Sequence, residues 1–293
     1  MINNNCKSAP DEIITLKARA SIERLRDCNL LDFWRNQWRQ FIANIRQASI
    51  KAIVMDYDGT VYAGGKLDNA LPDQEMTALL VKLLERGFYL GFASGRGESL
   101  RGALRQAFPK SLWAGIYAAY QDGAECGRLD DDTIPTSYDQ TKEDPALVHV
   151  REKLEKIFAT WPDRPYMRAE NKLLGVYGSV EKGELIFSAC CGVAVPLGLK
   201  VFHGGKMTDI TLPEVSKRNL YHAMPTSQDA ILSLGDAGSW PGNDSELLAT
   251  SLGVSVGSMS VDPASCWRIT SESGIEGTRR ILKALLKSGL DTL

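Results

Sequence analysis

The sequence has little of what several kinds of functional site require. Only three histidines occur among the 293 residues, and they lie far apart, which argues against a histidine-rich metal centre. The six cysteines form no Cys-x-x-Cys pair, and the chain is too long to be a disulfide scaffold, so we expect reduced thiols. We interpret the adjacent Cys190 and Cys191 as small buried apolar residues rather than as metal ligands.

Long apolar runs and an excess of one charge are also missing. No stretch approaches the ~18 consecutive apolar residues of a membrane-spanning helix. The polar start, Met1 to Asn5, lacks a basic-then-apolar leader, so we expect a cytoplasmic protein with no membrane partner. Lys and Arg number 34 and Asp and Glu 36, a formal net charge of −2. This balance gives no general attraction to nucleic acid, although it does not exclude a local basic groove.

What is present is enough apolar sequence, 44% of the chain, for a sizeable core. Residues 11–48 are predicted to be helical, because apolar positions recur there at three- and four-residue steps. This apolar stripe consists of Leu30, Phe33, Trp34, Trp38, Phe41, Ile42 and Ile45. We favour an N-terminal helical extension, residues 1–50, that packs on the main domain. The alternative is an interface for a homo-oligomer or a protein partner, which two tryptophans on one stripe support.

From residue 51 onwards, short apolar runs alternate with amphipathic stretches. Strands are predicted at 51–55, 88–93, 115–120, 230–234 and 253–257, and helices at 72–86 and from about 97 to 107. Strands that alternate with helices imply right-handed crossovers, so we predict an α/β fold with a Rossmann-like parallel sheet.

Residues 128–205 have a different pattern. The segment begins with the acidic run Asp130 to Asp132, which we expect to be a solvated hinge, and continues into a helix near 145–160. Strand-like pieces follow at 173–177, 185–189 and 199–203. We therefore predict an inserted α+β domain at 128–205 and a core domain made of 51–127 and 206–293.

Polar residues gather where the predicted buried strands end. In an open α/β sheet, ligands bind at these carboxyl ends. The first strand is followed by Asp56-Tyr57-Asp58-Gly59-Thr60 and the second by Ser94-Gly95-Arg96. The fourth strand is preceded by Lys217 and followed by Gly235-Asp236, with Asn243-Asp244 shortly after. We expect these side chains to share one site.

Clustered carboxylates with a lysine suit phosphoryl transfer. Carboxylate oxygens favour a hard divalent cation, above all Mg²⁺, and a carboxylate can attack phosphorus to form an aspartyl-phosphate. Two like charges ~4 Å apart repel by ~4 kcal/mol at an effective dielectric constant of about 20, a repulsion that Mg²⁺ and a lysine offset. Asp58, two residues after Asp56, points the same way and can act as general acid and then base.

These motifs resemble those of the haloacid dehalogenase (HAD) phosphohydrolase superfamily. Its first motif, DxDGT, is present as residues 56–60, its second matches Ser94, and its fourth matches Gly235-Asp236 with Asn243-Asp244. The third matches Lys217, preferred over Lys206, within a run from Thr208 that resembles the Cof-like and sucrose-phosphatase-like branch. The resemblance covers residues 51–285, and the insertion between the second and third motifs implies a type II cap, of the IIB subclass.

The resemblance also implies roles for individual residues. It makes Asp56 the nucleophile and a Mg²⁺ ligand, and Asp58 the acid/base residue, which also gives a backbone carbonyl to the metal. Asp236 is a further carboxylate ligand and Asp244 supports the metal site. The residues expected to bind the phosphoryl group or the substrate are Ser94, Lys217, Gly59, Thr60, Gly95, Arg96 and Asn243.

Two departures from the family pattern stand out. Six residues, Ala237 to Gly242, separate the Gly-Asp and Asn-Asp pairs, where the family has two, which raises the question whether Asp244 returns to the metal. The branch often has Asn-Gly-Ala after its third strand, whereas this chain has Asp122 at the first of these positions. We assign Met207 and Trp267 to the core, and leave open whether Trp240 shields the site and whether Arg96 contacts phosphate or a surface carboxylate.

The expected function is a Mg²⁺-dependent phosphomonoester hydrolase acting on a small phosphorylated metabolite, with sugar phosphates first. Cap contacts to the substrate are expected from Arg168, Glu170, Asn171 and Lys172. The alternatives are a phosphomutase resembling phosphomannomutase, a phosphatase of nucleotides or nucleic-acid ends, and an idle fold that serves as a partner-binding module.

Overall fold

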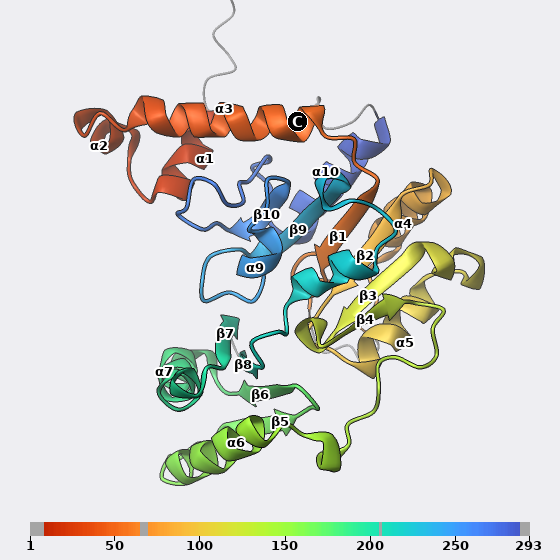
Figure 1. Cartoon of the computed structure of the whole chain (residues 1–293). Coiled ribbons are helices and arrows are strands. Elements are labelled where there is room, and N and C mark those ends of the chain that lie inside the picture. The colour runs from red at the N-terminus through yellow and green to blue at the C-terminus, as the bar shows by residue number, and fades with distance from the viewer. Residues whose placement is uncertain (1–8, 65–69, 205–206, 288–293) are drawn as a thin grey trace, which may run out of the picture.

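The computed structural model describes residues 9–64, 70–204 and 207–287, and they form two sheets with their helices. The six-stranded sheet has the order β10-β9-β1-β2-β3-β4, and the four-stranded sheet the order β5-β6-β8-β7. Figure 1 shows the four-stranded sheet beyond one end of the six-stranded sheet, and the N-terminal helix α3 across the opposite end. The predicted α/β core with an inserted α+β domain is confirmed.

The six-stranded sheet is parallel except for its edge strand. Its strands are β1 (Ala52–Asp56), β2 (Tyr89–Ala93), β3 (Ile116–Tyr120), β4 (Glu125–Arg128), β9 (Ile231–Ala237) and β10 (Gly253–Ser258). Only β4 runs antiparallel to its neighbour. Every residue of β1 and β3 is buried, because helices cover both faces, and this explains why these strands are apolar runs rather than alternating ones.

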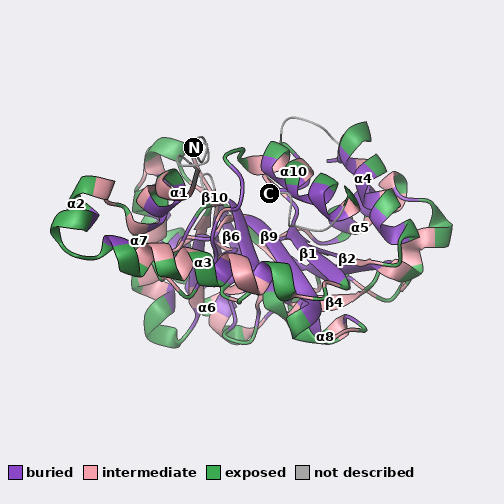
Figure 2. Ribbon diagram, turned by 90° about the horizontal axis from the view of Figure 1, so that it is seen from above, coloured by how far each residue is buried: buried purple, intermediate pink, exposed green. Residues whose placement is uncertain are grey.

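Helices α4 (Gln74–Glu85), α5 (Glu98–Ala107) and α10 (Gly274–Lys287) cover one face of this sheet (Figure 2). The short helices α8 (Leu220–Ala223) and α9 (Ser245–Leu248) cover the other. Among the described residues, no helix combines the length and the apolar character needed to cross a bilayer.

The N-terminal extension consists of α1 (Ala9–Ala18), α2 (Ile22–Asp27) and α3 (Leu31–Gln47), and it packs on the core as expected. Trp34, Trp38 and Phe41 lie with their ring centroids 5.9, 5.6 and 6.3 Å from that of the fully buried Trp267. The Lys17 ammonium lies over the same ring and donates to the Cys266 carbonyl at 2.7 Å. Trp267 is therefore a core residue, as predicted.

The inserted domain, hereafter the cap, has an antiparallel sheet with two helices against it. Its elements are α6 (Pro145–Phe158), β5 (Tyr166–Ala169), β6 (Leu173–Tyr177), α7 (Gly183–Ala194), β7 (Lys200–Gly204) and β8 (Met207–Thr211). The strand predicted at 185–189 is wrong, because this segment lies inside α7. Ile186, Cys190 and Ala194 are buried at four-residue steps, which is helical spacing. A short apolar run alone does not distinguish a helix from a strand.

The last cap strand also differs from expectation. The predicted division put residues from 206 onwards in the core, but β8 pairs with β6 and β7 in the cap sheet. The chain therefore returns to the core after Thr211, and residue 206 itself lies outside the described residues. Cys190 is fully buried and Cys191 half-buried, in agreement with their interpretation as apolar residues.

Candidate active site

The carboxyl ends of β1, β2 and β9 bring the predicted residues together at the edge of the core that faces the cap. Asp56 is the last residue of β1, Ser94 follows β2, and Asp236 lies near the end of β9. Lys217 is the first residue of a single 3₁₀ turn, Lys217–Asn219, whose preceding residue Ser216 caps it by accepting from the Arg218 amide.

The Lys217 ammonium is buried between two carboxylates. Its Nζ donates to Asp56 Oδ1 at 2.6 Å and to Asp244 Oδ1 at 2.7 Å, and Asp122 Oδ1 lies 3.8 Å away. Burial alone would lower the pKa of Lys217, but attraction by Asp244, Asp56 and Asp122 outweighs burial and raises this pKa well above its ordinary value. Lys217 is thus a fixed cation, whereas its competitor Lys206 lies outside the described residues.

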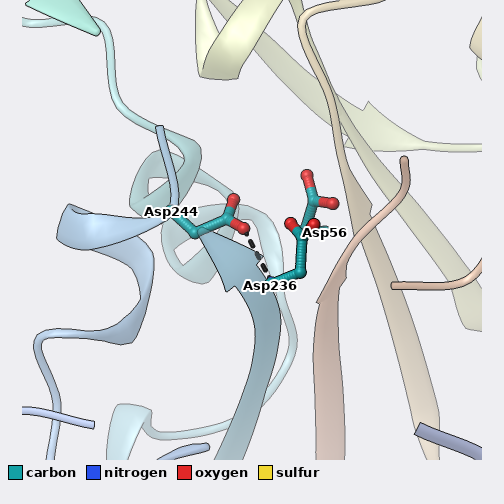
Figure 3. Close-up of side chains that lie close together, drawn as sticks. All are labelled: Asp56, Asp236 and Asp244. Carbon is teal, nitrogen blue, oxygen red and sulfur yellow. Dashed lines mark hydrogen bonds between the residues drawn. The ribbon is translucent and has the colours of Figure 1, made fainter. Parts of the chain in front are cut away.

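Asp56, Asp236 and Asp244 form an acidic cluster, with one carboxylate oxygen from each within 4.8 Å of the others (Figure 3). The longer loop does return Asp244, whose Oδ2 accepts from the backbone amides of Asp236 and Ala237 at 3.1 and 3.0 Å. The Asp236 carboxylate lies directly against the backbone of Gly59, where a Cβ would lie 2.3 Å from Asp236 Oδ2. Gly59 also has a φ of +88°, so a residue with a side chain would be disfavoured at this position on both grounds.

This cluster fits a divalent cation. Burial and then repulsion by Asp244 raise the pKa of Asp56 well above its ordinary value, and the same causes raise the pKa of Asp236 to about 6. Within the described ranges, Asp56 Oδ2 is buried and has no hydrogen-bond partner. Three converging carboxylates are the ligands that Mg²⁺ prefers, and a bound cation would relieve their repulsion.

Asp58 lies apart from the acidic cluster. Its carboxylate accepts from Arg96 Nε at 2.8 Å and Nη2 at 2.7 Å, and from Ser94 Oγ at 3.2 Å. Burial opposes the charged form of Arg96, but the bonds to Asp58 outweigh it and raise the pKa of Arg96. Arg96 therefore pairs with a carboxylate inside the site rather than with one on the surface.

A cavity of about 860 Å³ lies between the core and the cap and opens onto these residues. Of the residues expected to bind phosphate or substrate, Ser94, Gly95, Arg96, Lys217 and Asn243 line it. In the described part of the chain, Gly59 and Thr60 do not line it. Gly59 instead gives room to Asp236, and Thr60 is fully buried.

The cap supplies the other wall of the cavity. Arg168, one of the expected cap contacts to the substrate, lines it, and so does Met207, whose assignment to the hydrophobic core is wrong. Met207 is half-buried because β8, which it begins, belongs to the cap sheet at the seam between the domains. Trp240 stands at the mouth of the cavity, 68% exposed, with its ring against Phe187 of α7.

Of the other expected cap contacts, Glu170 is buried and paired with Arg168, while the Asn171 amide oxygen accepts from the backbone of Asp139. Asn171 and Lys172 are not among the residues that line the cavity in the described ranges.

Sequence reasoning missed Asp209, which lines the cavity from β8 and is 2% exposed. Burial, and then repulsion by Asp122, raise its pKa well above the ordinary value. A charged residue in the middle of a strand otherwise made of Met, Thr and Ile was the signal that could have identified it.

The comparisons with known proteins concern mainly the fold. No family model matches the sequence, and no curated protein matches it. Among solved structures, an N-terminal truncated Plasmodium falciparum IMP-nucleotidase is similar with a TM-score of 0.61 at 12% identity, over 96% of this chain and 83% of that one. A haloacid dehalogenase-like hydrolase from Bacteroides thetaiotaomicron is similar with a TM-score of 0.54 at 15% identity, over 80% and 99% of the two chains.

The chain has the fold of the haloacid dehalogenase-like hydrolases. An Aspergillus fumigatus trehalose-6-phosphate phosphatase shares it with a TM-score of 0.51 at 16% identity, over 86% of this chain and 97% of that one. The resemblance drawn from the motifs therefore agrees with the architecture, including the position of the cap between the second and third motifs.

Proposed function

We propose that this protein is a Mg²⁺-dependent phosphomonoester hydrolase that works through an aspartyl-phosphate on Asp56. The observation that carries the proposal is the convergence of Asp56, Asp236, Asp244 and Lys217 near the carboxyl ends of β1 and β9, beside a cavity that the cap and the core line together. This set combines a nucleophile, a cation site and a fixed ammonium, which are the groups that phosphoryl transfer to a carboxylate requires.

The nucleophile is held by one of its two oxygens. Lys217 fixes Asp56 through Oδ1 and opposes the rise in pKa that burial and Asp244 cause, so it favours the ionised form of this carboxylate. An oxygen of Asp56 attacks phosphorus, and the bond from phosphorus to the ester oxygen breaks. Ser94 and Lys217, which both line the cavity, bind the phosphoryl oxygens. A Mg²⁺ held by Asp56, Asp236, Asp244 and the Asp58 carbonyl would supply positive charge against the repulsion between carboxylate and phosphate.

Asp58 transfers the proton. It donates a proton to the departing ester oxygen, and it later removes a proton from the water that attacks phosphorus and frees Asp56. Because Arg96 donates two hydrogen bonds to the Asp58 carboxylate, Asp58 can carry a proton only when Arg96 gives up part of this contact. A phosphate dianion competes for the same guanidinium, so substrate binding itself would release Asp58.

The substrate is proposed to be a small phosphorylated metabolite, because the cavity between cap and core has a volume of about 860 Å³. Sugar phosphates come first, and one similar structure is named as a trehalose-6-phosphate phosphatase. Nucleotides are the second candidate. Trp240 offers an exposed aromatic ring at the cavity, suited to stacking on a base, and other similar structures are named as IMP-nucleotidases.

The test is phosphate release from a panel of sugar phosphates and nucleoside monophosphates, with and without EDTA. We expect Asp56→Asn to abolish hydrolysis while the fold, followed by circular dichroism, is retained. Asp229→Asn makes the same chemical change at an exposed position and should leave the rate unchanged. EDTA should stop hydrolysis and Mg²⁺ restore it. Full activity of the Asp56 variant, or activity that ignores the chelator, would refute the proposal.

A further inference from the structure

The turn between β3 and β4 has an unusual backbone. Gln121, Asp122 and Gly123 have φ values of 52°, 54° and 93°, three consecutive residues in the left-handed region. Only the third is a glycine, and the other two carry side chains that this conformation disfavours. A conformation of this cost persists only where its surroundings enforce it, and such residues are often functional.

The turn contacts both segments that would bind the phosphoryl group. The Gln121 amide donates to the Arg96 carbonyl at 3.0 Å, and the Asp122 amide donates to the Ser94 carbonyl at 2.9 Å. On the other side, a Cβ on Gly123 would lie 1.9 Å from the Ser216 carbonyl oxygen, so the turn is pressed against the residue that precedes Lys217. A displacement of this turn would therefore move Ser94 and Lys217 together.

The same turn reaches the cap through one buried hydrogen bond. Gln121 Nε2 donates to Glu170 Oε2 at 3.2 Å, and the two residues are 3% and 6% exposed. Glu170 Oε1 in turn forms an ion pair with Arg168 Nη2 at 2.5 Å, and Arg168 lines the cavity. A continuous set of contacts thus runs from the cap wall of the cavity to the backbone that carries Ser94.

Two other polar contacts join cap and core on the side of the long loop. The His203 amide donates to the Pro241 carbonyl at 2.8 Å, and Lys200 pairs with Glu246 at 2.9 Å. The Lys200 and Glu246 side chains are 24% and 37% exposed, so this ion pair is partly screened by solvent. The Gln121–Glu170 bond is buried, and it alone of these three contacts touches the phosphoryl-binding backbone.

We propose that Gln121 is a positioning residue, whose bond to Glu170 fixes the cap over the phosphoryl site and so couples Arg168 to Ser94 and Lys217. The proposal rests on the function proposed above, because it concerns the same site. A substrate whose alcohol part reaches the cap depends on this bond. A small phosphoryl donor such as acetyl phosphate, which fills only the phosphoryl end, depends on it much less.

A reciprocal exchange of the two side chains tests the proposal. Gln121→Glu puts two carboxylates against each other, and Glu170→Gln removes the charged acceptor. Gln121→Glu should lower kcat/KM for the best substrate of the panel by about 10- to 100-fold, the range for losing a hydrogen bond to a charged group. Glu170→Gln should lower it less, because the amide oxygen of a glutamine still accepts from Gln121. The double variant Q121E/E170Q restores the bond with its direction reversed, and should recover at least about tenfold over Q121E. Recovery excludes a direct effect of Glu at position 121 on Lys217, since the double variant keeps that charge.

Two further measurements separate this proposal from the function itself. Hydrolysis of acetyl phosphate should change by less than about threefold in all three variants, a change of under 1 kcal/mol. Hydrogen exchange of the full-length protein should speed up at 166–173 in Q121E and return towards wild type in the double variant. This second readout needs no turnover, so it remains decisive even if the wild-type protein hydrolyses no phosphoester.

The matched control is Gln140→Glu, the same change at an exposed position, which should alter neither rate nor exchange. The proposal is overturned if Q121E matches wild type in both readouts, or if the double variant is no better than Q121E. Should Q121E fail to fold, Glu170→Leu serves instead, because leucine cannot accept from Gln121, and unchanged exchange and unchanged kcat/KM in that variant overturn the proposal equally.

Discussion

Asp236 is expected to destabilise the protein when no metal is bound. Its pKa rises from 3.8 to about 6 because the carboxylate is buried and faces Asp244. An acid whose pKa is raised by folding keeps its proton in the folded state over a range where the unfolded chain has lost it. Stability from this residue is therefore present at low pH and lost as the pH rises from about 4 through 6.

The magnitude follows from the size of the rise. A change from 3.8 to about 6 corresponds to about 3 kcal/mol at pH 7, and to about half of that at pH 5, where the folded carboxyl is mostly protonated. Replacing Asp236 by Asn removes the charge at nearly constant volume. Asp236→Asn should therefore raise the free energy of unfolding in EDTA, by up to about 3 kcal/mol at pH 7 and by less at pH 5.

Urea unfolding followed by circular dichroism measures this difference, with wild type and variant compared at both pH values. Saturating Mg²⁺ should reverse the order at pH 7, because the cation stabilises the wild-type cluster and binds more weakly to the variant. The reasoning fails if Asp236→Asn is less stable than wild type in EDTA at pH 7, or if the gain is larger at pH 5 than at pH 7.

Two further substitutions test the packing around the site and under the extension. Gly59→Ala should weaken Mg²⁺ binding measured by calorimetry at least about tenfold, because its Cβ meets Asp236 at 2.3 Å. Gly64→Ala, which has a similar positive φ of 75° but no described atom within 4 Å, is its control and should leave Mg²⁺ affinity unchanged. Trp267→Ala should lower the free energy of unfolding by about 3–5 kcal/mol, because the ring is fully buried under α1 and α3. Trp240→Ala, at a residue 68% exposed, should cost less than about 1 kcal/mol, and equal losses in the two tryptophan variants would contradict the packing.

The core of the site could be predicted because its signals are local. The buried run Ala52–Asp56 identifies a strand by itself, and its polar end fixes Asp56 and Asp58 at the carboxyl edge of the sheet. Lys217 lies 161 residues from Asp56 in the chain, and its place among the polar residues at the strand ends, together with the motif resemblance, connected the two before the structure brought them to 2.6 Å.

The cap was predicted less well, because its signals depend on pairing between distant segments. The short, mostly apolar run 185–189 is compatible with either a helix or a strand. Only its packing against the cap sheet shows that it belongs to helix α7. Met207 was expected to be a buried apolar residue, but it begins β8 and lines the cavity between cap and core. Gln121 and Glu170 lie 49 residues apart in the sequence, and nothing in either segment indicates that they meet.

The length of the loop between Asp236 and Asp244 has a structural explanation in what the loop contacts. A shorter connection would suffice to bring the two carboxylates together, since Asp244 Oδ2 accepts directly from the Asp236 amide. The additional residues extend beyond the acidic cluster. The Pro241 carbonyl accepts from His203 in the cap, and Ser239 Oγ accepts from Arg19 of the N-terminal extension at 2.8 Å. Both cap and extension thus contact the segment that joins two residues of the acidic cluster, so the position of either one bears on the geometry of that cluster.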